Sequence, residues 1–419
     1  MTVLAVLAAL ALQDTDVERA AQKLAQRFTD EPESVEGLFH PDFFEGASAE
    51  RVTLIFKNVH GQYGECTAVE LVADESASAG VVYFVFGDRT RLAATIVVER
   101  EKPHRVTGLR FDMPRPVRRT VDEVLDEMKK LRGKTAFLLQ RTGERPLTVA
   151  EHQPDRPLAV GSTFKLAVLG ALLADPAAKE KRYWARAVEL SDDRKSMGSG
   201  VLDTWTPGSP LTLHTLATLM ISQSDNTATD HLIHALGRER VEGIAAEMGL
   251  ADEKRNLPLL TTLEAFKLKA SDALRKKFAA GDAEERRKLL AGPVRELPRE
   301  GLSFGSGPLA IDEVEWFASA SDCCRAMEWL RKRTDDPALA AGREILSVNP
   351  GVRFLKRAWK YVGFKGGSEP GVVSVSCLLR SSAGDWYTLS ATWNDPKRPL
   401  DEGLFMDLVQ DAVYALQRK

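Results

Sequence analysis

The chain lacks a strong charge imbalance: its 57 basic and 60 acidic residues leave a formal net charge of -3 over 419 residues. A nearly balanced surface creates no global field that would attract nucleic acid or an anionic membrane. The sequence therefore predicts no nucleic-acid partner, and a small-molecule or peptide substrate is the default expectation.

Cysteine is also scarce, with four residues in the whole chain. None of them has the spacing of a metal-ligand set, and the adjacent pair Cys323–Cys324 cannot easily bridge to itself. His231 and His234 lie one helical turn apart beside Asp230, but no further ligand cluster accompanies them. We expect no metal site and no cofactor.

Long apolar runs are missing. The longest candidate, MTVLAVLAALAL at the start, is too short to span a bilayer. It resembles the apolar core of a signal peptide and ends in the small-x-small pattern Ala9-Leu10-Ala11, although it has no basic segment before it. We expect residues 1–13 to be a signal-like segment and the protein to be exported to the periplasm or the medium, with a cytoplasmic location as the alternative.

Residues 14–112 predict a small α+β domain. Two amphipathic helices, around residues 17–28 and 52–59, precede four strand-like runs, CTAVELVA, VVYFVF, RLAATIVVE and HRVTGLRF. The order of elements is similar to that of cystatin-like or NTF2-like domains. It contains no catalytic constellation, and its partner is not identified by the sequence. The Pro- and Arg-rich stretch at 113–119 is expected to be a linker.

Residues 120–419 predict a second domain whose sheet takes strands from both ends of the segment. VDEVLDEMKKL is helical, and TAFLLQ with RPLTVAEH indicates a hairpin. The chain is then mainly helical to about residue 333, and VGFKGG, VVSVSCLL and TLSATW return to strand before a C-terminal amphipathic helix. We expect an α/β (α+β) fold with an antiparallel sheet beside an all-helical lobe.

The run AVGSTFKLAVLGALL places one cation in an apolar helix. A helix that is apolar all round is normally buried, and a buried ammonium needs partners or a lowered pKa. Ser162 and Lys165 are three residues apart and share one helix face. This arrangement lets a lysine take a proton from a serine nucleophile. Alternatively, Ser162 or Thr163 caps the helix and Lys165 extends to solvent.

Two further motifs follow in order. Ser224-Asp225-Asn226 lies between two helical runs, and Lys365-Gly366-Gly367-Ser368 ends a strand. Taken singly, Asn226 could be a helix N-cap and FKGGSEPG a hairpin turn. S-x-x-K, then S-D-N, then a lysine and glycine on a strand is the ordered signature of penicillin-recognising serine enzymes.

With these motifs the chain resembles class A β-lactamases over roughly residues 120–419. With its added N-terminal domain it is similar in architecture to the β-lactamase-like proteins of clavulanic acid gene clusters. The resemblance implies a β-lactamase/transpeptidase-like fold with the site between sheet and helical lobe, and a β-lactam or a related ester or amide as substrate.

The resemblance also implies roles. Ser162 is the nucleophile, Lys165 accepts its proton and Ser224 relays the proton to the leaving group. Lys365 attracts a substrate carboxylate, and Asn226 bonds the substrate's side-chain amide. The backbone N–H groups of Ser162 and Ser368, the latter beside Gly367, form the oxyanion hole.

Three departures from the family pattern stand out. K-G-G replaces K-T-G, and Ser368 offers a substitute hydroxyl. The stretch between the second and third motifs is longer than usual, with extra helical material between Ser271 and Ala318. No E-x-x-L-N is present: Glu264 falls in a capping box that begins at Thr261, and Glu253 has no accompanying pattern. We therefore expect weak deacylation.

Three functions remain open from sequence. The first is a serine hydrolase of the β-lactamase family, the second a D,D-peptidase of the cell wall, and the third a non-catalytic penicillin-binding or scaffold protein. The first two differ in whether β-lactams or D-Ala-D-Ala peptides turn over.

Overall fold

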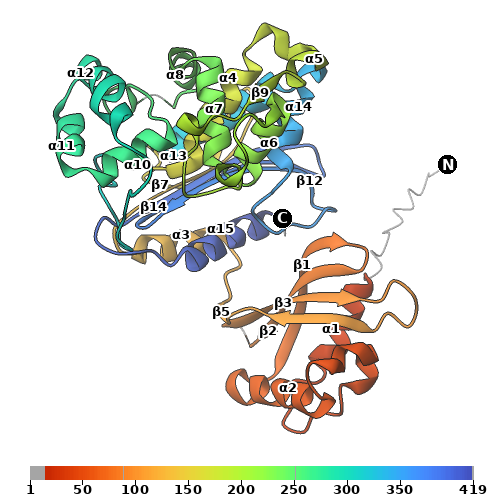
Figure 1. Ribbon diagram of the computed structural model, residues 1–419. Helices are drawn as coiled ribbons and strands as arrows, with labels where there is room; N and C mark the ends of the chain where they lie inside the picture. The colour runs from red at the N-terminus through yellow and green to blue at the C-terminus, as the bar shows by residue number, and fades with distance from the viewer. Residues whose placement is uncertain (1–14, 88, 251, 418–419) are drawn as a thin grey trace. The chain divides into compact units, whose positions relative to one another are not determined.

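The computed structural model describes residues 15–87, 89–250 and 252–417 and divides into two compact units (Figure 1). The first unit runs to Arg119 and includes Arg353–Arg357; the second comprises Thr120–Val352 and Ala358–Lys419. The assignment of residues 353–357 to the first unit was not predicted, because nothing in that short stretch distinguishes it by composition. The predicted segment 1–13 lies outside the described residues.

Within its described residues, the first unit contains two α-helices, two short 3-10 turns and an antiparallel sheet of order β1-β2-β3-β4, in which β5 also pairs with β3. Its elements are α1 (Asp16–Ala25), α2 (Ala49–Tyr63), β1 (Cys66–Ser76), β2 (Ala79–Phe86), β3 (Thr90–Val98), β4 (Val106–Phe111) and β5 (Arg115–Pro116). Phe28 contacts Phe56, Phe84 and Phe86 with ring centroids 4.8–5.1 Å apart. These rings form an aromatic core between helices and sheet.

The stretch predicted as a linker is tied to this sheet. Strand β5 pairs with β3 through Arg115 and Pro116, and the Val117 amide donates to the Arg89 carbonyl at 2.9 Å. The Pro- and Arg-rich composition gave no sign of this short pairing, since proline is tolerated only at strand edges and lacks a donor.

The second unit is built on a five-stranded antiparallel sheet of order β12-β13-β14-β6-β7. The strands are β6 (Lys134–Arg141), β7 (Leu147–His152), β12 (Trp359–Glu369), β13 (Val372–Ser381) and β14 (Trp386–Asn394). Strands from both ends of the segment therefore share one sheet, as predicted. Strand β12 is an edge strand, so one side of its backbone is left for other contacts.

Helices cover both faces of this sheet. Figure 1 shows α3 (Val121–Lys130) and α15 (Glu402–Gln417) together on one face and α13 (Ala320–Arg333) on the other. Thr120 and Glu123 form a capping box that starts α3. The predicted combination of an antiparallel sheet with a helical region is confirmed.

The helical region lies between β7 and β12 in sequence. Its longer helices are α4 (Lys165–Leu173), α6 (Leu213–Ser222), α7 (Asn226–Leu236), α8 (Arg238–Glu247), α10 (Thr262–Ala270), α11 (Asp272–Ala280), α12 (Ala283–Leu289) and α14 (Ala340–Ser347). The expected extra material after Ser271 is helical through α11 and α12 and a π-helical turn, Leu290–Val294. From there to β11 (Phe317–Ala318) the chain is largely irregular, and glycine and proline in GLSFGSGPL account for the change.

Helix α4 is the centre of the unit, and all of its residues are buried. It packs on α7, α8 and α13 within the main hydrophobic core. In the described part of the chain, no helix is both long and apolar enough to cross a membrane.

Candidate active site

The predicted nucleophile and lysine lie at the start of α4. Ser162 is in a 3-10 turn, Gly161–Phe164, that leads directly into the helix at Lys165. No side chain caps this helix, and Lys165 is 0% exposed. The alternative in which Ser162 or Thr163 caps the helix and Lys165 reaches solvent is therefore wrong.

Partners from the S-D-N motif surround the buried ammonium of Lys165. Its Nζ donates to the Ser224 carbonyl and to Asn226 Oδ1, both at 2.6 Å, and reaches Ser224 Oγ at 3.2 Å. Burial, together with the charge of nearby Lys365, lowers the pKa of Lys165 well below its usual value. A lysine in this environment can become a neutral amine, which is the form that accepts a proton.

Ser224 has a strained backbone that aims it at this centre. Its φ is 55°, in the left-handed region that a residue with a Cβ seldom adopts. Its carbonyl accepts bonds from both Lys165 Nζ and Ser199 Oγ, the latter at 2.6 Å. These two bonds offset the strain and hold the carbonyl inward.

The S-D-N motif also starts α7, but Asp225 caps the helix and Asn226 does not. Asp225 accepts bonds from the amides of Ala228, Val201 and Leu202. Asn226 is thereby free of the capping role: its Oδ1 holds Lys165, and its Nδ2 donates to the Met197 carbonyl at 2.6 Å. In this arrangement both ends of the Asn226 amide contact the protein.

A second buried lysine approaches from β12. Lys365 is 2% exposed, and its Nζ donates to Ser224 Oγ at 3.0 Å and to the Gly366 carbonyl. Burial lowers the pKa of Lys365 to about 7. A carboxylate ligand beside Lys365 would favour its charged form.

Glycine brings β12 against the nucleophile. A Cβ on Gly367 would lie 2.2 Å from the Val160 carbonyl oxygen and 2.5 Å from the Ser162 amide nitrogen. A Cβ on Gly161, whose φ is 49°, would lie 3.4 Å from the Ser368 amide nitrogen. The backbones of Ser162 and Ser368 are therefore close neighbours, as a two-donor oxyanion site requires.

A cavity of about 360 Å³ opens beside these groups. Ser162, Ser199, Asn226 and Ser368 form part of its lining. Trp316 also borders it and stacks on Phe164 with ring centroids 4.0 Å apart and an interplanar angle of 5°. The remaining lining residues are Gly161, Gly198, Thr262, Ala265, Phe266, Lys269, Phe304, Gly305, Gly307, Leu309, Glu315, Glu369 and Pro370.

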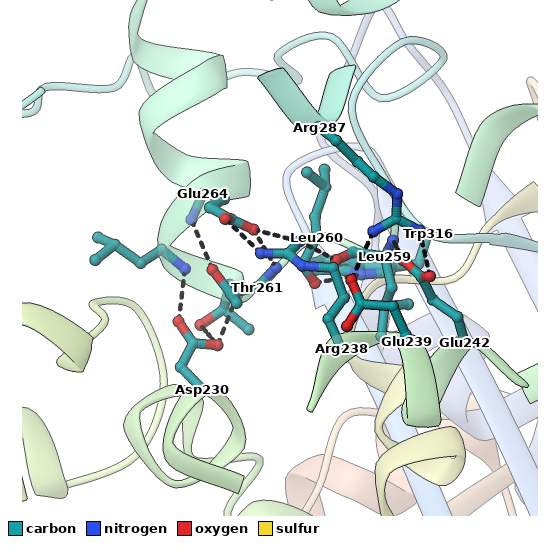
Figure 2. Close-up of polar contacts among 12 residues, drawn as sticks. Asp230, Arg238, Glu239, Glu242, Leu259, Leu260, Thr261, Glu264, Arg287 and Trp316 are labelled. Carbon is teal, nitrogen blue, oxygen red and sulfur yellow. Dashed lines mark hydrogen bonds and ion pairs between the residues drawn. The ribbon is translucent and has the colours of Figure 1, made fainter. Parts of the chain in front are cut away.

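The expected capping box at Glu264 is confirmed, and Arg238 also binds this carboxylate. Thr261 Oγ1 accepts from the Glu264 amide, and Glu264 Oε2 accepts from the Thr261 amide at 2.8 Å. Arg238 donates to the two carboxylate oxygens at 2.7 and 2.9 Å, as Figure 2 shows. Glu264 is thus bound within the protein and is not a base aimed at Ser162. Glu253 lies in the short helix α9 (Glu253–Asn256).

His231 and Asp230, which were considered as metal ligands, have other partners. His231 Nε2 accepts from the Ser191 amide at 2.9 Å. Asp230 accepts from the amides of Thr262 and Leu263 at 2.7 and 2.9 Å, at the start of α10. The described residues contain no group of three or more His, Cys, Asp or Glu side chains that could hold a metal. All four cysteines are free thiols.

One feature of the cavity was missed by sequence reasoning. Lys269 Nζ lies 2.6 Å from Glu315 and 2.6 Å from both oxygens of Glu369. The three residues are far apart in the chain, so no local pattern joins them. The available signal was a charged residue, Glu369, two positions after Gly367 on the same strand face.

Comparison with known proteins matches part of the chain to a family model. Residues 116–291 match the model of a family described as the beta-lactamase enzyme family. No curated protein matches the sequence. Similar solved structures include a β-lactamase from Sphaerobacter thermophilus, with 22% identity and a TM-score of 0.48 over 71% of this chain and 94% of that one. PBP-A has 16% identity and a TM-score of 0.48 over 71% and 94%. A β-lactamase from Desulfarculus baarsii has 18% identity and a TM-score of 0.48 over 71% and 96%.

Proposed function

Residues 116–291 belong to a β-lactamase enzyme family, as the order of the motifs predicted, and on this premise we propose that the protein is a serine hydrolase. Ser162 forms an acyl-enzyme with a β-lactam or a related ester or amide. The observation that carries the proposal is the position of Lys165, whose buried ammonium lies one helical turn from Ser162 and bonds to Ser224 and Asn226. A buried cation is costly, and a role as proton acceptor accounts for it.

In the acylation step Ser162 Oγ attacks the carbonyl carbon of the substrate, and the neutral amine of Lys165 takes the hydroxyl proton. The negative charge that develops on the carbonyl oxygen is stabilised by the amides of Ser162 and Ser368. Ser224 Oγ, which lies between the two lysines at 3.2 and 3.0 Å, gives its proton to the leaving nitrogen or oxygen and takes in exchange the proton that Lys165 accepted. The bond from carbonyl carbon to leaving group then breaks.

Lys365 provides the binding site for a substrate carboxylate. In the free protein its pKa of about 7 leaves it only partly charged at neutral pH. A bound carboxylate raises that pKa again, so the ion pair forms with the ligand. Substrate binding also separates the roles of the two lysines, since Lys365 stays charged while Lys165 is neutral.

Deacylation is the weak step of the proposed cycle. Hydrolysis of the acyl-serine ester needs a base that deprotonates a water molecule. The carboxylate of Glu264 is held by Arg238 and the Thr261 amide. Lys165 itself must then act as the base, and the acyl-enzyme should be long-lived.

The proposal is tested with a fluorescent penicillin. Unmodified protein should retain the label through a denaturing gel, and Ser162→Ala should not. Retention by Ser162→Ala would place the nucleophile at another residue. No labelling of the unmodified protein by any penicillin, cephalosporin or activated ester would leave a non-catalytic scaffold as the better account. Release of D-alanine from D-Ala-D-Ala peptides, without turnover of β-lactams, would identify a D,D-peptidase instead.

Export of the protein to the periplasm or the medium belongs to the same proposal, because β-lactams and cell-wall peptides are met outside the cytoplasm. Fractionation of cells that express the chain from its first methionine tests this part. We expect the protein in the exported fraction.

A further inference from the structure

The cavity beside Ser162 is lined by a charged group that is separate from Lys165 and Lys365. It consists of Lys269 on α10, Glu315 just before β11, and Glu369 at the end of β12. All three residues line the cavity that Ser162 also lines. We refer to Lys269, Glu315 and Glu369 as the acidic triad.

The acidic triad has two carboxylates but one ammonium group, so its charges do not balance when both acids are ionised. Lys269 Nζ contacts both acids at 2.6 Å, and its side chain is 5% exposed. In the described part of the chain no other lysine, arginine or histidine forms an ion pair with Glu315 or Glu369. When both acids are ionised the triad carries a net charge of -1 in a buried place, which favours binding of one further positive charge.

Glu369 is the member that a ligand can reach. Its side chain is 22% exposed, whereas that of Glu315 is 2% exposed. A carboxylate has about four acceptor positions, and Lys269 uses one on each oxygen of Glu369. Burial and the nearby charge of Glu315 raise the pKa of Glu369, so a proton supplies the missing charge when no ligand is present.

Glu369 also lies on the reactive side of the strand. Lys365, Gly367 and Glu369 alternate along β12 and therefore share one face. Gly367 is the point where the Ser162 amide meets the strand. The lysine and the glutamate are thus on either side of the nucleophile, with their Cα atoms roughly 13 Å apart along an extended strand.

We propose that the active site selects zwitterionic substrates, with a carboxylate bound at Lys365 on one side of Ser162 and a protonated amine on the acyl group bound at Glu369 in the cavity on the other side. The inference rests on the proposed function, because it places the scissile carbonyl at Ser162 between the two charged ends. Phe266 and Phe304, with ring centroids 5.5 Å apart, supply an apolar wall on the same cavity. A cationic group near these rings gains further attraction from their faces.

Ampicillin and benzylpenicillin are a matched pair for the test, since they differ only by the α-amino group of the acyl side chain. Binding is measured by calorimetry on Ser162→Ala, so that no acylation intervenes. The pH is kept below the pKa of the ampicillin amine, so that the amine is protonated. We expect ampicillin to bind about tenfold more tightly, the usual value of one hydrogen bond to a charged group. Glu369→Gln in the same background should reduce the ratio to about one.

Two further variants make the result specific. Glu369→Asp keeps the charge and should retain part of the preference. Glu313→Gln, which removes an exposed acid paired with Arg275, should leave the ratio unchanged. Equal affinities in the Ser162→Ala protein, an unchanged ratio in Glu369→Gln, or no binding of either penicillin would overturn the inference. Acylation of the unmodified protein by benzylpenicillin is measured separately, so a preference for ampicillin without any acylation would support the inference while refuting the proposed function.

Discussion

The ammonium groups of Lys165 and Lys365 meet at a single oxygen, the Ser224 hydroxyl, at 3.2 and 3.0 Å. Two positive charges so close to each other in a buried place are unfavourable. Both pKa values are lowered, and the charge of Lys365 contributes to the shift of Lys165. The pair is therefore suited to hold a single positive charge, with the proton preferably on Lys365.

Lys165 and Lys365 together should give the acylation rate at low substrate concentration a bell-shaped pH dependence. Raising the pH deprotonates Lys165, so the acylation rate constant should rise and reach a plateau well below pH 10. Above about pH 7 the free protein loses the charge on Lys365, so the affinity for a substrate carboxylate should fall. Stopped-flow acylation at several substrate concentrations separates the two limbs. A rate constant that still rises through pH 10 would contradict the lowered pKa of Lys165.

Replacing Lys365 by arginine should remove the alkaline limb of the pH dependence. Arginine stays charged at every accessible pH, so carboxylate binding should no longer weaken above about pH 7. The affinity at low pH should fall as well, because the guanidinium does not fit the site of the Lys365 ammonium. An alkaline limb unchanged in Lys365→Arg would show that another group titrates there.

Gly367→Ala should abolish acylation, because the new Cβ would lie 2.2 Å from the Val160 carbonyl and 2.5 Å from the Ser162 amide. Both contacts are with backbone, so neither can yield by a side-chain rotation. The matched control is Gly243→Ala on α8, where nothing lies within 4 Å of the new Cβ. The control should acylate normally, and circular dichroism should show both variants folded. Normal acylation by Gly367→Ala would mean that the strand moves freely relative to Ser162.

Glu264→Gln should affect stability and not turnover. The change removes the charge from a partly buried ion pair with Arg238, whose side chains are 17% and 19% exposed, and should lower the free energy of unfolding by about 1–3 kcal/mol. Denaturant titration measures this loss, and the exposed pair Glu284–Lys288 provides a control, Glu284→Gln, with little expected change. A large drop in deacylation with Glu264→Gln would restore this residue as the base.

Turnover of benzylpenicillin should show a burst that matches one site, followed by a slow phase. A positioned general base is typically worth about 10² to 10⁴ in rate, and the carboxylate of Glu264 is already bound by Arg238. Quenched-flow measurement of product resolves the two phases. A linear time course with rapid turnover would mean that another residue acts as the general base for deacylation.

The sequence predicted the parts of this site that depend on local spacing or on the order of the motifs along the chain. The pair Ser162 and Lys165 follows from helix spacing, and the apolar neighbours of Lys165 predict its burial. The capping box at Thr261 and Glu264 is also local, since its two partners are three residues apart.

Contacts between distant segments could not be predicted in this way. The acidic triad joins residues from three elements, and its formation depends on the irregular segment that ends at Glu315. The left-handed backbone of Ser224 could not be predicted either, because a serine in the sequence does not indicate a positive φ. The bonds from Lys165 and Ser199 that stabilise it come from other parts of the fold.

The central claim is that Ser162 is acylated with Lys165 as its base, and site-resolved mass spectrometry of the acylation time course tests it most directly. Benzylpenicillin is added to the unmodified protein, to Ser162→Ala, to Lys165→Ala and to Lys179→Ala, a control on an exposed lysine paired with Asp336. We predict one adduct on the peptide that contains Ser162, none in Ser162→Ala, normal kinetics in the control, and acylation slowed by about 10² to 10⁴ in Lys165→Ala. An adduct at another residue, or a normal rate in folded Lys165→Ala, would contradict the claim.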